Sequence, residues 1–308
     1  MSHLMEKRTQ QKILIVVGPT ASGKSALAVQ LARRFHGEVI SADSRQIYKG
    51  LDVGTGKITK KEMLGIPHHL LDIVDPKKSF SVSDYKKLAE TKIEEILRRG
   101  KLPIIAGGTG FYIDAVTGKA SLPEVPPNAV LRKKLEARTA EELFKELTKK
   151  DPVRAETIDK HNKVRLVRAL EIVAALGKVP PLRQGSAGQT SYEYIWIGLK
   201  PEKSELETKI EKRLTARLPK MILEAKRLHA NGLSWKRMSE VGIEYKHLSA
   251  YLQKRITKQE LRDGILKDSI AYSKRQDTWF KTNKGIMWFP SGASKEIESY
   301  LTNIIKGV

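Results

Sequence analysis

The chain has 308 residues, 40% of them hydrophobic, which suffices for a buried core but leaves no apolar stretch of the roughly 20 residues that a membrane span needs. It contains no cysteine, which excludes disulfides and thiolate zinc sites, and its first residues lack an apolar signal core, so we expect a cytoplasmic protein with no membrane partner. The net charge of +22 favours a polyanionic partner over a small metabolite, unless the protein simply has a basic, well-solvated surface.

The first apolar run of the chain, Ile13 to Val17, ends in a phosphate-binding motif. The motif G-x-x-x-x-G-K-S lies between a predicted strand and a predicted helix, which is the context in which such a loop binds an oligophosphate. The loop N–H groups and the helix N-terminus attract negative charge, Lys24 would reach the terminal phosphate, and the Ser25 hydroxyl would ligate Mg²⁺. The candidate phosphate-binding residues are Gly18, Pro19, Thr20, Ala21, Ser22, Gly23, Lys24 and Ser25.

Strands and helices alternate over the first 120 residues, which predicts a parallel α/β sheet flanked by helices. Asp43 follows the second strand, at the edge where ligands bind in open sheets of this kind. The wholly apolar run Leu102–Ala106 is expected at the centre of the sheet, and residues 107–112 turn into a helix at the same edge. The remaining predictions here are a glycine-rich loop over 51–57, a short third strand over 68–73, and a helix from Ser81 or Ser83 to about Arg99.

At the proline-rich stretch 122–127 the pattern of alternating strands and helices ends. Charged amphipathic helices without a strand follow it, so we expect an all-helical domain inserted into the α/β core. The predicted domains are the first part of the core over 1–122, the insertion over 123–189, and the remainder of the core over 190–308. The elements predicted after the proline-rich stretch are helices over 131–138, 140–149 and 163–176, a mobile loop over 180–189, a strand over 192–199, a helix over 204–230 interrupted at Pro219, a helix over 258–281, and a strand over 286–289 followed by a helix to residue 305.

The positive charge is concentrated toward the C-terminus. Residues 200–284 hold 21 Lys and Arg against 11 Asp and Glu. A partner with a phosphate backbone would explain this excess, because each neutralised phosphate releases counterions.

The chemistry at the sheet edge differs from that of an ordinary P-loop NTPase, in which an Asp at the end of an apolar strand serves the Mg²⁺. Here the strand over 102–106 ends in Gly107-Gly108-Thr109 without an acid, and the carboxylate at this edge is Asp43. Asp43 is placed to accept a proton from a nucleophile that faces the phosphate group. The alternative is an acid that only caps a turn or a helix.

Several segments together resemble one family, the tRNA dimethylallyltransferases (tRNA isopentenyltransferases). The runs DSRQIY, GLDVGTGK and GGTG are far more specific than the P-loop. The run VGIEYK at 241–246 departs from the Ile-Gly-Tyr-Lys-like pattern expected there, and the zinc-finger tail of eukaryotic members is absent, so the chain resembles a bacterial member. The matching segments are GPTASGKS at 18–25, ISADSRQIYKGLDVGTGK at 40–57, PHHLLDI at 67–73, IIAGGTGFYI at 104–113, RLVRALEI at 165–172 and YSKRQDTWFK at 272–281.

The resemblance implies that dimethylallyl diphosphate lies on residues 18–25 and that its allyl group goes to the exocyclic N6 amine of the adenosine 3′ to the anticodon in tRNA. Lys24 and a Mg²⁺ on Ser25 would stabilise the leaving pyrophosphate, Thr109 would donate a further hydrogen bond, and Asp43 would be the base. The base to be modified would be flipped out of the anticodon stem-loop, where Gln46 could read its edge. The residues expected to contact tRNA are Asp43, Ser44, Arg45, Gln46, Thr109, Arg132, Lys163, Arg165, Arg168 and Arg275.

We expect a monomer, and two other classes of function stay open. A kinase or a free-nucleotide isopentenyltransferase would share the P-loop and Asp43 but would not explain the helical insertion or the charge. An RNA-binding module without activity would explain the charge but not the P-loop together with Asp43. Arg165 and Arg168 could form only a solvated helix face, and His68 and His69 are expected to pack in a strand rather than to bind a ligand.

Overall fold

The computed structural model describes residues 10–181 and 192–306, which fall into two compact units. Of these residues, one unit combines 10–117 with 192–306, and the other spans 118–181. Most of the loop predicted over 180–189 lies outside the described residues.

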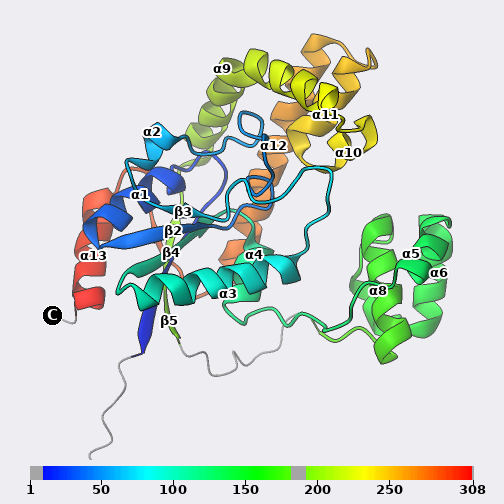
Figure 1. Cartoon of the computed structure of the whole chain (residues 1–308), viewed down its shortest axis with the longest axis horizontal. Helices are drawn as coiled ribbons and strands as arrows, with labels where there is room; N and C mark the ends of the chain where they lie inside the picture. Colours follow the sequence, from blue (N-terminus) through cyan, green and yellow to red (C-terminus); the bar gives the residue numbers. More distant parts are fainter. Residues whose placement is uncertain (1–9, 182–191, 307–308) are drawn as a thin grey trace, which may run out of the picture. The chain divides into compact units, whose positions relative to one another are not determined.

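The larger unit is built on a six-stranded sheet in which every pair of neighbouring strands is parallel (Figure 1). The strand order is β3-β2-β4-β1-β5-β6, so the apolar strand that contains residues 102–106 is an inner strand, as predicted. Leu14 of β1 pairs with Ile104 on one side and with Ile195 on the other. The strands are β1 Gln11–Val17, β2 Gly37–Ser41, β3 His68–His69, β4 Leu102–Gly107, β5 Tyr192–Leu199 and β6 Met287–Phe289.

Both faces of the sheet are covered by helices, which explains the continuous apolar runs within β1 and β4. Leu14 and Val16 belong to a core cluster with side chains of α1 and α13, whereas Ile13 and Ile15 belong to a cluster with side chains of α3, α4 and α12 (Figure 1). The prediction of a P-loop α/β core with a parallel sheet between helices is confirmed. These helices are α1 Lys24–Arg34, α3 Val82–Arg98, α4 Gly110–Val116, α12 Lys258–Lys281 and α13 Ser294–Lys306.

The third strand is shorter than predicted. It holds only His68 and His69, because Leu70 and Asp72 have φ angles of 61° and 54°, which extended backbone does not allow. The expected strand over 68–73 was therefore wrong beyond His69.

The helix α9, Lys203–Ala230, runs without a break through Pro219, so the predicted interruption was wrong. A proline removes one backbone N–H and strains one turn. Here Leu214, Leu218 and Met221 are buried on one side of the helix around that turn, and this packing holds the helix together.

Several short helices were not predicted, because helices of one to three turns give little periodicity. They are α2 Lys60–Met63, α7 Pro152–Thr157, α10 Trp235–Glu240 and α11 Ile243–Leu252.

The smaller unit contains helices and no strand over its described residues, 118–181. Its core is a leucine cluster that includes Leu143, Leu147, Leu166 and Leu170. Each of its helices begins at a side-chain cap, for example Thr139, whose hydroxyl accepts the N–H of Glu142. The helices of this unit are α5 Ala129–Glu136, α6 Ala140–Lys150, α7 and α8 Lys163–Leu176. Over the part of the chain that the structure describes, no helix is long and apolar enough to cross a membrane.

Candidate active site

The loop between β1 and α1 has the shape of an anion-binding cradle. Gly23 caps α1 with a φ of 91°, a left-handed conformation that glycine adopts freely, and Lys24 begins the helix. The ammonium of Lys24 reaches back to donate to the carbonyl of Pro19 at 3.1 Å. The Ser22 hydroxyl is buried, and among the described residues it has no hydrogen-bond partner. A buried donor of this kind suits the oxygen of a bound phosphate.

A cavity of about 500 Å³ lies at the carboxyl edge of the sheet and joins this loop to Asp43. The parallel strands β1, β2 and β4 all end here, which is why loops distant in sequence line one pocket. The lining of the pocket is partly apolar. The residues that line it are Thr20, Ala21, Gly23, Lys24, Ser25, Ala26, Val39, Ser41, Asp43, Gln46, Thr55, Gly56, Ile58, Glu62, Leu64, His68, Leu71, Ala106, Gly107, Lys209, Arg213 and Arg217.

Three of the cations in this pocket come from α9, and the sequence analysis did not predict them as site residues. Lys209, Arg213 and Arg217 are four residues apart, so they share one face of the helix. The guanidinium of Arg213 donates to the hydroxyl of Thr20 at 2.7 Å. The i, i+4, i+8 spacing was the available signal, but nothing in the sequence says which face of α9 meets the P-loop.

The ammonium of Lys24 lies among other charges. Burial lowers its pKa to about 8, the nearby Asp43 carboxylate opposes that shift, and Arg213 adds to it. Burial also lowers the pKa of Arg213, and the neighbouring Arg217 acts in the same direction. The site therefore concentrates positive charge that an anionic ligand would stabilise.

Asp43 is oriented by the turn that follows it. Its Oδ1 accepts the backbone N–H of Arg45 at 2.9 Å and that of Gln46 at 3.4 Å, so the capping interaction considered for this residue is present. The same side chain lines the pocket with Lys24, so capping does not remove the carboxylate from the site.

Thr109 and Ser44 fasten the Asp43 turn to the loop after β4. The Thr109 hydroxyl accepts the N–H of Ser44 at 3.0 Å, and the N–H of Thr109 donates to the carbonyl of Ala42 at 3.0 Å. The Gln46 amide lies 3.5 Å from the carbonyls of Thr55 and Gly56. In this structure Thr109 and Gln46 thus fix loops to one another.

Gln276 of α12 joins the two loops that flank the pocket. Its Oε1 accepts the N–H of Thr20 at 2.8 Å, and its Nε2 donates to the carbonyl of Gly108 at 2.9 Å. A Cβ on Gly108 would lie 2.0 Å from that Nε2, so only glycine allows this approach. Gln276 is 5% exposed. The sequence analysis identified the segment YSKRQDTWFK that contains it, but did not predict a role for Gln276 itself.

The segment 241–246, whose role was open, anchors the glycine-rich loop at 52–54. The phenol of Tyr245 donates to Glu224 at 2.6 Å. The carboxylate of Glu224 also accepts the backbone N–H groups of Asp52, Val53 and Gly54 at 2.8–2.9 Å. Four donors on one buried carboxylate fix the loop that leads to Thr55 and Gly56 in the pocket wall.

The residues predicted to contact tRNA are not all in one unit. Arg45 and Arg275 are exposed on the larger unit, and the Arg275 guanidinium lies 5.7 Å from the centre of the Tyr272 ring. Arg132, Lys163, Arg165 and Arg168 belong to the smaller unit.

Two of the arginines of the smaller unit have structural partners there. Arg132 donates to the buried carboxylate of Glu171 at 2.5 Å, and Arg168 donates to the carbonyl of Val125 at 2.8 Å. Arg165 is exposed near the start of α8 and Lys163 is half-buried, so Arg165 is the freer of the two cations.

The two histidines differ from each other. His69 Nε2 lies 2.7 Å from the buried carboxylate of Glu38, which also binds Arg99 and Lys101. His68 contributes to the wall of the pocket, while its Nδ1 lies 2.9 Å from the carbonyl of Ile66.

The parallel sheet, the loop before α1 and the cation-rich pocket define a P-loop α/β protein with a site for an anionic ligand. The model of the IPP transferase family matches residues 46–283, and the chain belongs to this family. It is 41% identical over 282 residues to the tRNA dimethylallyltransferase of Anoxybacillus flavithermus, covering 91% of this chain and 90% of that one. It is 40% identical over 287 residues to the tRNA dimethylallyltransferase of Bacillus subtilis, covering 91% of each chain.

Solved structures agree with this assignment. The crystal structure of the full-length tRNA isopentenylpyrophosphate transferase from Bacillus halodurans aligns with a TM-score of 0.72 at 37% identity, over 96% of this chain and 97% of that chain. A eukaryotic dimethylallyltransferase acting on tRNA aligns with a TM-score of 0.78 at 24% identity, over 96% of this chain and 80% of that one, and shows the common fold.

The lowered pKa of Lys24 predicts pH-dependent anion binding. With a pKa near 8 the free protein loses the ammonium charge as pH rises through 8, so affinity for inorganic pyrophosphate should fall about tenfold between pH 7 and pH 9. Lys24→Arg stays charged over this range. Because pyrophosphate itself titrates there, the measurement is the ratio of wild-type to variant dissociation constants by calorimetry. A ratio that does not change with pH would contradict the assignment.

Gln276 should act on anion binding through the loop that it holds. Gln276→Leu removes both hydrogen bonds, and we expect pyrophosphate affinity to fall by up to roughly thirtyfold, because two such bonds contribute about 1 kcal/mol each. The exposed Gln259→Leu on the same helix is the matched control. Both variants are compared well below their unfolding temperatures, with tRNA affinity measured in parallel. An equal loss of pyrophosphate and tRNA affinity would mean that Gln276 serves only the fold.

Proposed function

We propose that this protein transfers the dimethylallyl group of dimethylallyl diphosphate to the exocyclic N6 amine of the adenosine 3′ to the anticodon in tRNA, with release of pyrophosphate. The observation that carries the proposal is the pocket in which the P-loop, Asp43 and the cations of α9 meet. The names of the relatives, tRNA dimethylallyltransferase and tRNA isopentenylpyrophosphate transferase, support the same reaction.

The cations suit the leaving group. As the allylic C–O bond breaks, negative charge accumulates on the pyrophosphate oxygens. Lys24, Arg213 and the loop N–H groups lie where the diphosphate would bind, and the unpartnered hydroxyl of Ser22 would donate to it. The apolar residues of the same pocket, among them Ile58 and Leu71, suit the hydrocarbon part of the substrate.

Asp43 suits the nucleophile. The lone pair of the adenine N6 amine is delocalised into the ring, so attack on the allylic carbon requires loss of a proton as the C–N bond forms. A carboxylate that lines the diphosphate pocket can accept this proton, and the bonds from the Arg45 and Gln46 N–H groups keep the Asp43 side chain oriented. The products are the N6-alkylated adenosine, pyrophosphate and a proton on Asp43.

Mg²⁺ is the expected cofactor, and the donor set is compatible with it. Mg²⁺ prefers oxygen ligands and is usually held by few protein groups together with substrate phosphates and water. The Ser25 hydroxyl is such a group at the pocket. When bound, the ion would neutralise charge on the diphosphate.

The charge and the helical insertion suit an RNA substrate. A base must leave its stack to enter a pocket of this size, and contacts with the RNA backbone can offset that free-energy cost. Ser44, Arg45, Gln46 and Arg275 of the larger unit and Lys163 and Arg165 of the smaller one remain the proposed contacts, while Arg132 and Arg168 would have to contact tRNA in addition to their present partners. The protein is proposed to act as a monomer, and tRNA as substrate supports a cytoplasmic location.

The decisive experiment offers two acceptors. The protein is given labelled dimethylallyl diphosphate and Mg²⁺ with either AMP or an anticodon stem-loop that carries adenosine 3′ to the anticodon. We expect label in the stem-loop and almost none in AMP, because only the RNA uses the basic surface. Efficient labelling of AMP would indicate a free-nucleotide enzyme. Labelling of neither, with γ-phosphate transfer from ATP to an acceptor, would indicate a kinase.

Asp43→Asn tests the proposed base. The amide keeps the size of the side chain and can still accept the turn hydrogen bonds, but it cannot take up the proton, so single-turnover transfer should slow roughly 10²-fold or more. Binding of dimethylallyl diphosphate should change little. Single-turnover rates close to the wild type would rule out Asp43 as the general base.

A further inference from the structure

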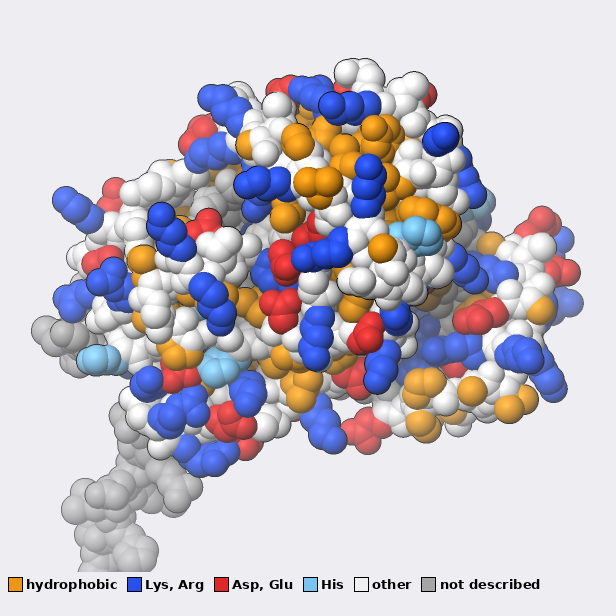
Figure 2. Space-filling model, turned by 45° about the horizontal axis from the view of Figure 1, so that its top comes forward, with side chains coloured by type: hydrophobic (Ala, Val, Ile, Leu, Met, Phe, Trp, Pro, Cys, Tyr) orange, Lys and Arg blue, Asp and Glu red, His pale blue; other side chains and the backbone are white. Residues whose placement is uncertain are grey.

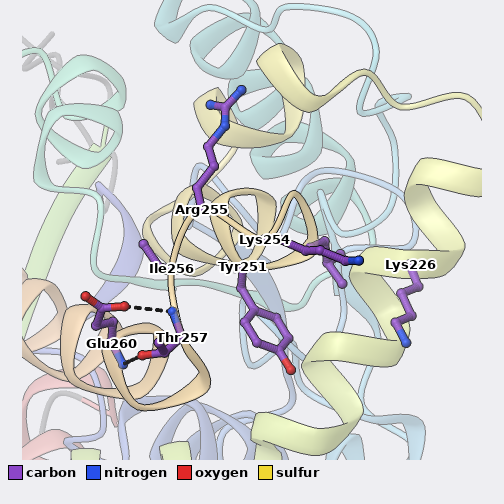
Figure 3. Close-up of a pocket in the computed structure, with 8 residues that line it drawn as sticks. Lys226, Tyr251, Lys254, Arg255, Ile256, Thr257 and Glu260 are labelled. Atoms are coloured by element: carbon purple, nitrogen blue, oxygen red, sulfur yellow. Dashed lines mark hydrogen bonds between the residues drawn. The ribbon is translucent and has the colours of Figure 1, made fainter.

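A second hollow lies farther along α9, separate from the P-loop pocket. It has a volume of about 420 Å³ and is formed where α9, the end of α11 and the start of α12 meet (Figure 3). No residue lines both cavities. The residues that line the second hollow are Lys226, Tyr251, Leu252, Lys254, Arg255, Ile256, Thr257 and Glu260.

The hollow carries uncompensated positive charge. Within residues 10–181 and 192–306, Lys226, Lys254 and Arg255 form no ion pair with a carboxylate. The one acid of the hollow, Glu260, is already engaged, because its carboxylate accepts the N–H of Thr257 at 2.7 Å in the cap of α12. The acid therefore belongs to the helix start and leaves the cations without a partner.

Two of the cations, Lys254 and Arg255, lie on a turn whose backbone is hydrogen-bonded, and Lys226 lies on α9. Lys254 has a φ of 58°, and its N–H donates to the carbonyl of Tyr251 at 2.9 Å, while the N–H of Arg255 donates to that of Ala250 at 2.9 Å. In Figure 3 the Lys254 side chain points toward Lys226 of α9, the Tyr251 ring lies below Lys254 in the view, and the Arg255 side chain points away from both lysines. Tyr251, Leu252 and Ile256 pack against the main core and give the hollow a firm floor.

We infer that this hollow binds the phosphodiester backbone of the tRNA substrate at a point away from the reacting adenosine, an inference that rests on the proposed function. Unpaired cations beside an aromatic ring are the means by which proteins hold a nucleic-acid strand without reading its sequence. Lys226 lies nine residues beyond Arg217 on α9, which corresponds to about 14 Å along the helix and to half a turn around it, so the two cations lie on opposite sides of α9. The hollow would therefore hold a part of the RNA backbone that crosses α9 away from the P-loop pocket.

The charge of the molecule agrees with such a contact. The face in Figure 2 carries many Lys and Arg side chains, with acidic and hydrophobic side chains between them. The hollow also belongs to the segment 200–284, in which basic residues exceed acidic ones by 10. A separate contact with the RNA backbone would explain basic residues of this segment that do not line the P-loop pocket.

The test removes two charges from the hollow. In the double variant Lys226→Ala, Lys254→Ala, tRNA affinity at 0.1 M salt should fall roughly tenfold, and the slope of log affinity against log salt should decrease by about 1.5, as expected for two lost phosphate contacts. Transfer at saturating tRNA and dimethylallyl diphosphate should be unchanged. The matched control is Lys87→Ala, Lys295→Ala, which removes the same charge from exposed lysines of α3 and α13 and should leave the slope within about 0.5 of the wild type.

The outcomes separate this inference from the proposed function. The inference would be overturned if the slope of log affinity against log salt were unchanged in the hollow variant, or reduced equally in the control. Normal transfer to tRNA in the same variants would still support the proposed function. Inorganic phosphate is titrated against both variants in the absence of RNA. Loss of phosphate binding in the hollow variant with an unchanged tRNA slope would assign the hollow to a small free anion and would also overturn the inference. Absence of transfer in the wild type would instead refute the function.

Discussion

The close contact between the ends of β2 and β4 is the constraint on which the site depends. The N–H of Ala42 donates to the carbonyl of Ala106, and the carbonyl of Ala42 accepts the N–H of Thr109. A Cβ on Gly107 would lie 2.2 Å from the Ala42 carbonyl oxygen, so any larger residue would push the strands apart. This contact fixes the turn that carries Asp43 beside the loop that carries Thr109. Since β1 pairs with β4 on its other side, the same register sets the distance from Asp43 to the P-loop.

Two long helices, α9 and α12, hold the loops at the strand ends in place. In α9, Arg213 donates to the P-loop residue Thr20 and the carboxylate of Glu224 accepts the N–H groups of residues 52–54. In α12, Gln276 binds both Thr20 and Gly108. A P-loop is often treated as a self-contained motif, but here one of its backbone N–H groups and one of its hydroxyls are bound by residues from the C-terminal third of the chain. Anion binding is thereby coupled to the packing of these helices.

The part of the site that could be predicted is the part encoded locally. The P-loop, Asp43 at a strand end and the inner apolar strand follow from short patterns, and so do the parallel sheet and the helical insertion. Arg213 and Gln276 could not be located in this way, because 193 and 256 residues separate them from Thr20 and only the packed fold brings them together. The predicted interruption at Pro219 was wrong for the opposite reason. Proline locally disfavours a helix, but tertiary packing overrides that preference here. Arg132 was predicted as a tRNA contact, and its ion pair with the buried carboxylate of Glu171 could not be predicted, because the sequence does not show which residues of two helices meet.

The place of β5 in the sheet has a consequence for biosynthesis. β1 is the first strand to leave the ribosome, and β4 can pair with it early, but its other edge is reserved for β5, which follows the helical insertion in sequence. Throughout synthesis of the intervening helices the nascent chain therefore exposes an apolar strand with unpaired N–H and C=O groups, an edge to which other strands can add. The smaller unit, whose contacts are local, can fold during this interval. The chain thus combines an insertion whose contacts are local with a sheet that is completed only near the end of translation, when β6 has been made.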